Sequence, residues 1–126
     1  MYIYFLTLCT LLVLDGIWLL YVAKSFYEKQ LGTLLAEKVT YWPVGLFYTL
    51  YAFGIVYFAI TPALEAKSLM VAIYRGAFLG LLAYGAYDFT NQATLAKWPV
   101  AITIADLLWG VTLTAAASGV VYLMAR

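Results

Sequence analysis

Histidine is absent from the 126-residue sequence, and cysteine occurs only once. Histidine is the commonest metal ligand and the commonest general base near neutral pH. Its absence therefore argues against zinc, di-iron and haem sites of the usual kinds. The single cysteine, Cys9, excludes an intrachain disulfide. Because Cys9 lies within an apolar run, we expect a buried small hydrophobic residue and no reactive thiol.

Charged residues are also scarce, at 10% of the chain, whereas 67% of the residues are hydrophobic. Soluble domains carry roughly 25% charged residues. The net charge of +1 gives no indication of nucleic acid as a partner. Several apolar runs approach or exceed the roughly 18–20 residues that cross a bilayer. We therefore predict an integral membrane protein in contact with lipid, with residues 1–126 forming a single domain.

Four membrane spans are predicted, at about Tyr2 to Ala23, Tyr41 to Ile60, Ser68 to Phe89 and Trp98 to Met124. Each is expected to be a helix, because backbone groups in lipid must be paired within the segment. The fold class is thus all-α and polytopic. A cleaved signal peptide is the competing interpretation of the first span. It is disfavoured because the run is long, contains an acid and has no basic residue ahead of it.

The longest connection, residues 24–40, has apolar residues at helical spacing, with charged residues largely on the other face. This pattern predicts a short amphipathic helix at the membrane interface, broken or bent near Gly32. A solvated loop is an equally good interpretation of so short a segment.

Orientation follows from the lysines and arginines near the span ends. The side that holds the long connection has Lys24, Lys29, Lys38 and Lys97, whereas the opposite side has Lys67 and Arg126, and Arg75 if it is counted. The excess is small. It places both termini outside the cytoplasm.

Two acids interrupt the outermost spans, Asp15 in the first and Asp106 in the fourth. Each lies eight residues from the end of its span on the long-connection side, a depth of about 12 Å at the rise of an α-helix. The acids are therefore expected at one level. Each has a tryptophan three residues further on, Trp18 and Trp109, on the same helical face as its acid.

Arg75 enters the third span from the opposite side, about 10 Å deep. An aspartate at the bilayer centre costs roughly 2.5–3.5 kcal/mol on insertion scales, so Asp15 and Asp106 should face the bundle interior and find partners. Two interpretations remain open. Arg75 bridges both acids and locks three helices together, or the three residues handle a proton, ion or solute in a cavity. With one arginine for two acids, either one acid holds a proton or a cation or water is bound.

Four tyrosines fall in the same half of the membrane as the acids, where their hydroxyls would line such a cavity: Tyr48, Tyr51, Tyr84 and Tyr87. In the third span, Gly76 and Gly80 form a Gly-x-x-x-Gly motif, which lets helices approach closely. Packing within the chain is the main interpretation of this motif, and homodimerisation through it is the lesser one.

The segment from Ala86 to Gly110 resembles a family of small bacterial four-helix membrane proteins catalogued as a domain of unknown function. The family's pattern is matched by Tyr87-Asp88-Phe89-Thr90-Asn91, then Trp98-Pro99, then Asp106-Leu107-Leu108-Trp109-Gly110. The resemblance covers essentially the whole chain. It implies four spans in a bacterial inner membrane, and it implies no activity.

Within this segment, residues 87–91 are expected to be a helix end that meets a turn. Asn91 would cap the helix C-terminus. Asp88, at the end of its span and close to water, would cap the turn or guard the mouth of a cavity.

The candidate ligand- or ion-binding residues are therefore Asp15, Trp18, Arg75, Tyr87, Asp88, Asn91, Asp106 and Trp109. They favour a small transporter or channel component. A homodimer is the expected form, because four helices enclose little space. A non-catalytic membrane-complex subunit, or a lipid- or quinone-binding protein, is the alternative. An intramembrane enzyme is the weakest interpretation, because no activated nucleophile accompanies the acids. The sequence identifies no cofactor.

Overall fold

The computed structural model describes residues 1–126, and it contains helices and no strands. The elements in chain order are α1 (Tyr2–Ile17), η1 (Trp18–Val22), α2 (Lys24–Leu31), η2 (Gly32–Leu34), α3 (Tyr41–Ile55), η3 (Val56–Ile60), α4 (Thr61–Ala66), α5 (Leu69–Thr94) and α6 (Val100–Ala125). Four continuous helical stretches are long and apolar enough to cross a membrane: Tyr2–Val22, Tyr41–Ala66, Leu69–Thr94 and Val100–Ala125. The predicted all-α, four-span fold is confirmed.

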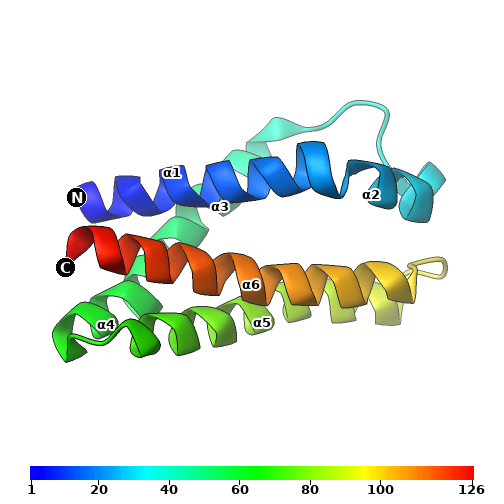
Figure 1. Ribbon diagram of the computed structural model, residues 1–126. Helices are drawn as coiled ribbons and strands as arrows, with labels where there is room; N and C mark the ends of the chain where they lie inside the picture. The colour runs from blue at the N-terminus through cyan, green and yellow to red at the C-terminus, as the bar shows by residue number, and fades with distance from the viewer.

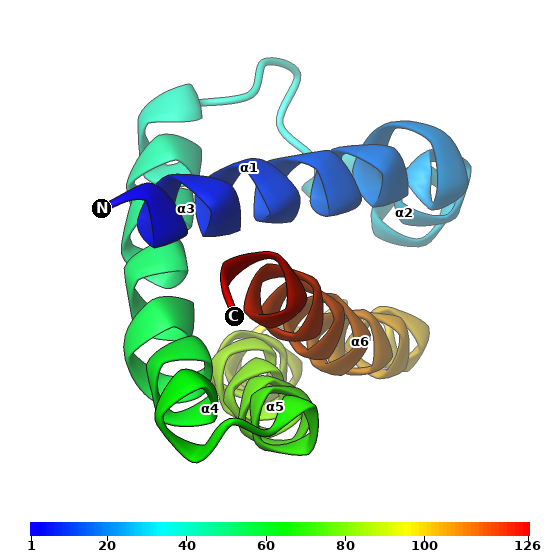
Figure 2. The ribbon, with the colours of Figure 1, turned by 60° about the vertical axis from the view of Figure 1, so that its left-hand side comes forward.

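The four spans run back and forth, so that both termini lie at one end of the molecule and α2 lies at the other (Figure 1). Helices α5 and α6 lie side by side along their length, and α1 packs on α6. Helix α3 runs obliquely to these three and closes one side of the bundle (Figure 2). This topology brings the first and the last span together, which is the condition for Asp15 and Asp106 to share a site.

The second span extends beyond its predicted end at Ile60, because the helix continues through Thr61 and Pro62. The chain passes from α3 through the π-helical turn η3 into α4, which has Pro62 in its first turn and ends at Lys67. Proline is tolerated in a first turn, where its missing N–H is not needed. Lys67 adopts the left-handed conformation (φ 54°) that commonly stops a helix.

The third span also continues beyond its predicted end at Phe89, to Thr94. Asn91 therefore lies inside the last turn of α5 and does not cap it, contrary to the sequence-based expectation. Its backbone carbonyl accepts a 2.9 Å hydrogen bond from the N–H of Leu95, the residue that follows the helix. The helix continues because the residues after Phe89 are polar but none of them prevents helical hydrogen bonding.

The glycines of α5 bring this helix into close contact with α6. A Cβ atom added at Gly80 would lie 2.1 Å from the carbonyl oxygen of Gly110, and one at Gly76 would lie 2.5 Å from Oγ of Ser118. The Gly-x-x-x-Gly motif thus serves packing within the chain, as mainly expected. Its face is covered by α6, which corrects the lesser expectation that it forms a homodimer contact.

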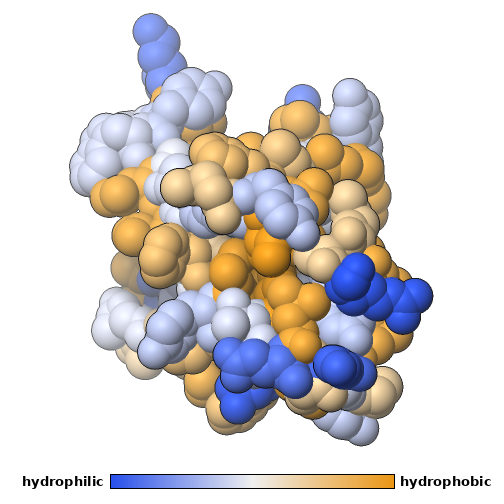
Figure 3. All heavy atoms as spheres, turned by 90° about the vertical axis from the view of Figure 1, so that its left-hand side faces the viewer, coloured by the Kyte–Doolittle hydropathy of each residue, from blue (hydrophilic) through white to orange (hydrophobic).

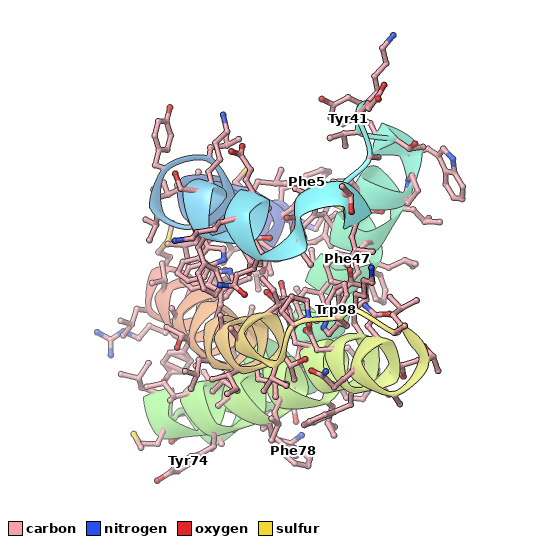
Figure 4. The ribbon with its side chains drawn as sticks, turned by 90° about the vertical axis from the view of Figure 1, so that its right-hand side faces the viewer. Phe5, Tyr41, Phe47, Tyr74, Phe78 and Trp98 are labelled. Carbon is pink, nitrogen blue, oxygen red and sulfur yellow. The ribbon has the colours of Figure 1, made fainter.

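The outer surface of the bundle is apolar, as lipid contact requires. Tyr74 and Phe78 point away from the bundle and are 66% and 61% exposed (Figure 4). Hydrophobic residues also occupy the middle of the end that carries the termini, with strongly hydrophilic residues toward its lower edge (Figure 3). Cys9 is exposed on the outer surface of α1, so the expectation of a buried cysteine is wrong. In lipid an apolar residue loses nothing by facing outward.

The predicted helix in the long connection is present as α2, and Gly32 directly follows it. Gly32 has φ 50°, a value at which a residue with a side chain would be strained. After η2 the chain has no regular structure up to Thr40. The place of α2 at the membrane interface stays a prediction.

Candidate functional site

A cavity of about 840 Å³ lies at the end of the bundle that carries α2. Residues from α1, η1, α2, the connection to α3, α3, α5 and α6 line it, and 15 of the 20 lining residues are hydrophobic. Figure 4 looks onto this end and shows Phe47 and Trp98 toward the middle of the bundle; both belong to the lining. Asp15 and Asp106 both line this cavity, so the acids of the first and the last span share one site.

Asp15 is held by donors from two other spans. Its side chain is 5% exposed. Trp109 Nε1 on α6 donates to Oδ1 at 2.8 Å, and the hydroxyl of Tyr48 on α3 donates to Oδ2. Both carboxyl oxygens therefore accept a hydrogen bond. Hydrogen bonds to a charged group contribute about 1.5–3 kcal/mol each, which offsets much of the cost of placing an acid at this depth.

Asp106 is held by a donor from α2. The hydroxyl of Tyr27 donates to Asp106 Oδ1, and Trp18 Nε1 donates to the Tyr27 oxygen at 3.1 Å. This chain of donors links η1, α2 and α6. The side chain of Asp106 is 9% exposed. Helix α2 thus covers one acid of the cavity through a single tyrosine.

The two tryptophans join the halves of this network. The rings of Trp18 and Trp109 are stacked, with centroids 4.5 Å apart and planes 8° from parallel. Each tryptophan was expected beside the acid of its own helix, but the pairing is crossed. Trp109 bonds to Asp15 directly, and Trp18 reaches Asp106 through Tyr27. Trp18 begins the π-helical turn η1, and such turns widen a helix locally and are frequent at functional sites.

Arg75 does not meet the acids, which corrects the expectation of a bridging arginine. Its side chain is exposed, and Nη1 donates to the carbonyl oxygen of Phe58 in η3 at 3.2 Å. Pro62 follows Phe58 by four residues and has no N–H with which to continue the helical bonding. Arg75 supplies this carbonyl with a donor from the neighbouring helix α5.

Asp88 also lies elsewhere than expected. It is fully buried, and neither carboxyl oxygen has a hydrogen-bond partner, so it caps no turn. It is not part of the cavity lining, although it lies close enough to Asp106 for their charges to interact. Helix α5 continues to Thr94, so Asp88 lies within the helix and not at its end. This is why it neither caps a turn nor lies at a cavity mouth.

Of the four tyrosines expected at the cavity, Tyr48, Tyr84 and Tyr87 line it. Tyr87 contacts Trp98 edge-on, with ring centroids 5.9 Å apart. Tyr51 lies in the core, where its hydroxyl shares a 2.6 Å hydrogen bond with Oγ1 of Thr114. Asn91 is absent from the lining.

Sequence reasoning did not single out Tyr27 as a site residue. It lies 79 residues from Asp106 in the chain, and its spacing indicated only the apolar face of α2. Burial raises the pKa of Tyr27 well above its usual value, and the hydrogen bond to Asp106 adds to the shift. The phenol therefore remains a proton donor throughout the neutral range.

Gln92 and Thr103 were missed as well. The Gln92 amide donates to the Trp98 carbonyl at 2.9 Å, and the Trp98 indole donates to Oγ1 of Thr103 at 3.1 Å. Thr103 in turn donates to Oε1 of Gln92 at 2.8 Å. This closed set of bonds fixes the turn between α5 and α6, and it holds Trp98 at the cavity wall. In the sequence, the only indication of these bonds was that polar residues occur on both sides of Trp98-Pro99.

The charged groups of the lining are mostly acidic. Asp15, Asp106 and Glu28 contribute three carboxyl groups, against the single ammonium group of Lys24. Lys24 and Glu28 are exposed, whereas the two aspartates are buried. No salt-bridging arginine or lysine neutralises the buried pair; their donors are phenols and an indole. Such a site is suited to holding positive charge.

Fold and site together define a class, a small four-span helical membrane protein with an acid-containing aromatic cavity. A family profile described as "Predicted membrane protein (DUF2177)" matches residues 1–123. The chain belongs to this family, in agreement with the resemblance carried by residues 86–110. No curated protein and no solved structure matches the chain.

Proposed function

We propose that this protein is a small transport component that handles a proton or a cation through Asp15 and Asp106. The observation that carries this proposal is the pair of buried carboxyl groups in one cavity, with no basic side chain paired to either. Ionisable groups inside a membrane span are costly and mark ion or solute pathways. Hydrogen-bond donors lower that cost but leave the negative charge of the site uncompensated.

The placement of the cavity fits such a role. It lies at the end of the bundle where Lys24, Lys29, Lys38 and Lys97 occur, which the positive-inside rule assigns to the cytoplasm. The protein then resides in a bacterial inner membrane with both termini outside, and α2 lies at the cytoplasmic interface. Fusions of alkaline phosphatase and of green fluorescent protein to Arg126 test this, since only the phosphatase fusion should be active.

The transport proposal is tested with purified protein in liposomes. Currents on a solid-supported membrane are recorded after jumps in proton, sodium or potassium concentration. Asp15→Asn and Asp106→Asn, which keep the side-chain shape and remove the charge, should abolish the wild-type current. Glu65→Gln is the matched control, because Glu65 is exposed on α4 at the other end of the molecule. Equal currents from wild type and both aspartate variants would contradict the proposal.

A second function is favoured by one observation, the apolar character of the cavity wall, to which 15 of 20 residues contribute. An apolar ligand such as a lipid or quinone would be buried there by a non-catalytic membrane subunit. Mass spectrometry of protein purified in mild detergent should then reveal such a molecule, or a partner protein, in fixed ratio. Preparations free of lipid and partner would speak against this alternative.

A further inference from the structure

We infer that the ligand of the cavity is a lipophilic organic cation, in which a positive charge is carried on an apolar body. This inference rests on the proposed function and names the substrate class of the same site. The cavity combines two features that such a cation needs, buried carboxyl groups and an aromatic wall. Neither feature alone would select it.

The aromatic wall is the first feature. Eight of the twenty lining residues are phenylalanine, tyrosine or tryptophan, from η1, α2, α3, α5, α6 and the turn before α6. An aromatic face attracts a cation, and the attraction grows when both are removed from water. The apolar body of an organic cation would at the same time bury its own surface against these rings.

The groups present in the cavity disfavour magnesium and calcium as ligands of this site. Magnesium and calcium take six or more oxygen ligands. Here both oxygens of Asp15 already accept bonds, from Trp109 and Tyr48. No third carboxyl, cysteine or histidine group joins the two aspartates in a ligand cluster. An organic cation needs no direct bond to a carboxyl oxygen. Its charge is attracted to the two acids at a distance, while Tyr27, Tyr48 and Trp109 keep their hydrogen bonds to them.

Charge and size agree with this ligand class. Three acidic groups and one basic group leave a formal charge of −2 in the lining when all four are ionised. A volume of about 840 Å³ lies within the range of roughly 300–1,000 Å³ for sites that bury a drug-sized molecule. Glu28 and Lys24 are exposed, whereas the two aspartates are buried, so negative charge becomes dominant toward the interior.

The probe for this inference is tetraphenylphosphonium, whose positive charge is surrounded by four phenyl rings. Binding is measured by equilibrium dialysis against protein in detergent, with protein-free micelles as the reference. Tetraphenylborate is the matched control ligand, because it has the same shape and the opposite charge. The wild-type protein should bind the phosphonium saturably and should not bind the borate.

Three variants locate the binding in this cavity. Asp15→Asn and Asp106→Asn should each weaken phosphonium binding by about tenfold or more, because each removes a charge from a poorly solvated site. Phe47→Leu should weaken it by about two- to fivefold through the loss of one ring. Glu65→Gln should bind like wild type. Circular dichroism and gel filtration establish that each variant is folded. The comparison of phosphonium with borate on the wild-type protein tests the inference without any variant.

The outcomes separate this inference from the proposed function. Equal binding of phosphonium and borate would overturn the inference, since charge would then play no part. Absence of phosphonium binding, together with proton or sodium currents that need Asp15, would overturn the inference and leave the proposed function standing. Absence of both binding and aspartate-dependent currents would overturn both.

Discussion

The indole N–H of Trp109 on α6 donates a 2.8 Å hydrogen bond to the carboxyl group of Asp15 on α1, across 94 residues of sequence. This bond ties the last span to the first. The Trp109 ring is also stacked on Trp18, so this ring contacts η1 as well as Asp15.

Trp109→Phe removes this donor and keeps an aromatic ring for stacking. We expect the free energy of unfolding to fall by about 1–3 kcal/mol, because a buried carboxyl group loses one of its two partners. Unfolding in mixed micelles, followed by circular dichroism, measures the change. Trp42→Phe is the control, since Trp42 is 72% exposed and should change stability by less than about 0.5 kcal/mol. An equal effect of the two substitutions would show that the bond to Asp15 contributes nothing.

Tyr27→Phe should change how the stability of the protein depends on pH in alkaline solution. Burial raises the pKa of Tyr27 in the folded protein, whereas the unfolded chain has a value near 10. Its contribution is therefore fully present below about pH 10 and is lost as the pH rises above that value, because only the unfolded state releases the proton. Melting temperatures between pH 7 and 11 should fall less steeply for Tyr27→Phe than for wild type. Parallel curves would show that Tyr27 titrates alike in both states.

Arg75→Leu tests whether the arginine acts on the acids or only on the backbone of η3. Arg75 contacts the Phe58 carbonyl and neither aspartate, so phosphonium affinity should stay within about twofold of wild type, as expected for independent sites. Equilibrium dialysis gives the affinity. A tenfold change in either direction would mean that Arg75 sets the charge of the cavity after all.

Gly80→Ala should disrupt the contact between α5 and α6. The added methyl group would meet the Gly110 carbonyl at 2.1 Å, and this backbone cannot move without separating the helices. Overpacking of this kind costs about 1–3 kcal/mol or more. Gly54→Ala is the matched control in α3, where a Cβ atom meets nothing within 4 Å. The melting temperature of Gly80→Ala should be well below that of Gly54→Ala. Equal melting temperatures would refute the close packing.

Asp88→Asn should leave stability unchanged or raise it, because the carboxyl oxygens of Asp88 have no partner to lose. Thr114→Val provides the contrast. Its hydroxyl is bonded to Tyr51 in the core, and removal should cost about 1–3 kcal/mol. Unfolding of both variants in the same detergent tests the pair. A loss on Asp88→Asn as large as that on Thr114→Val would reveal a structural role for Asp88.

Much of the fold could be predicted from the sequence because hydropathy acts along each helix separately. The four spans and the burial of Asp15 and Asp106 follow from the cost of exposing charge or backbone to lipid. Helix ends were less accurate at Pro62 and at Asn91. At both, a proline or polar residue suggested a stop, and the chain kept its helical bonds through a π-helical turn or a longer helix.

The candidate site was predictable only in part, because it depends on how each helix is rotated about its axis. Arg75 is next to Gly76, and Gly76 must face α6 for the two helices to pack. Successive residues of a helix are turned by about 100°, so this contact turns Arg75 away from α6. Spacing along one span contains no information on that rotation, and for the same reason the burial of Asp88 was not foreseen.

By itself, the sequence determined that this chain has four helices long and apolar enough to cross a membrane and that two acids lie within them. Those properties arise from composition and rise per residue, which are local. The tertiary structure alone decided that Tyr27, Tyr48 and Trp109 hold the acids and that Arg75 does not. Side-chain partners from distant segments are chosen by helix packing, and packing is a property of the whole bundle.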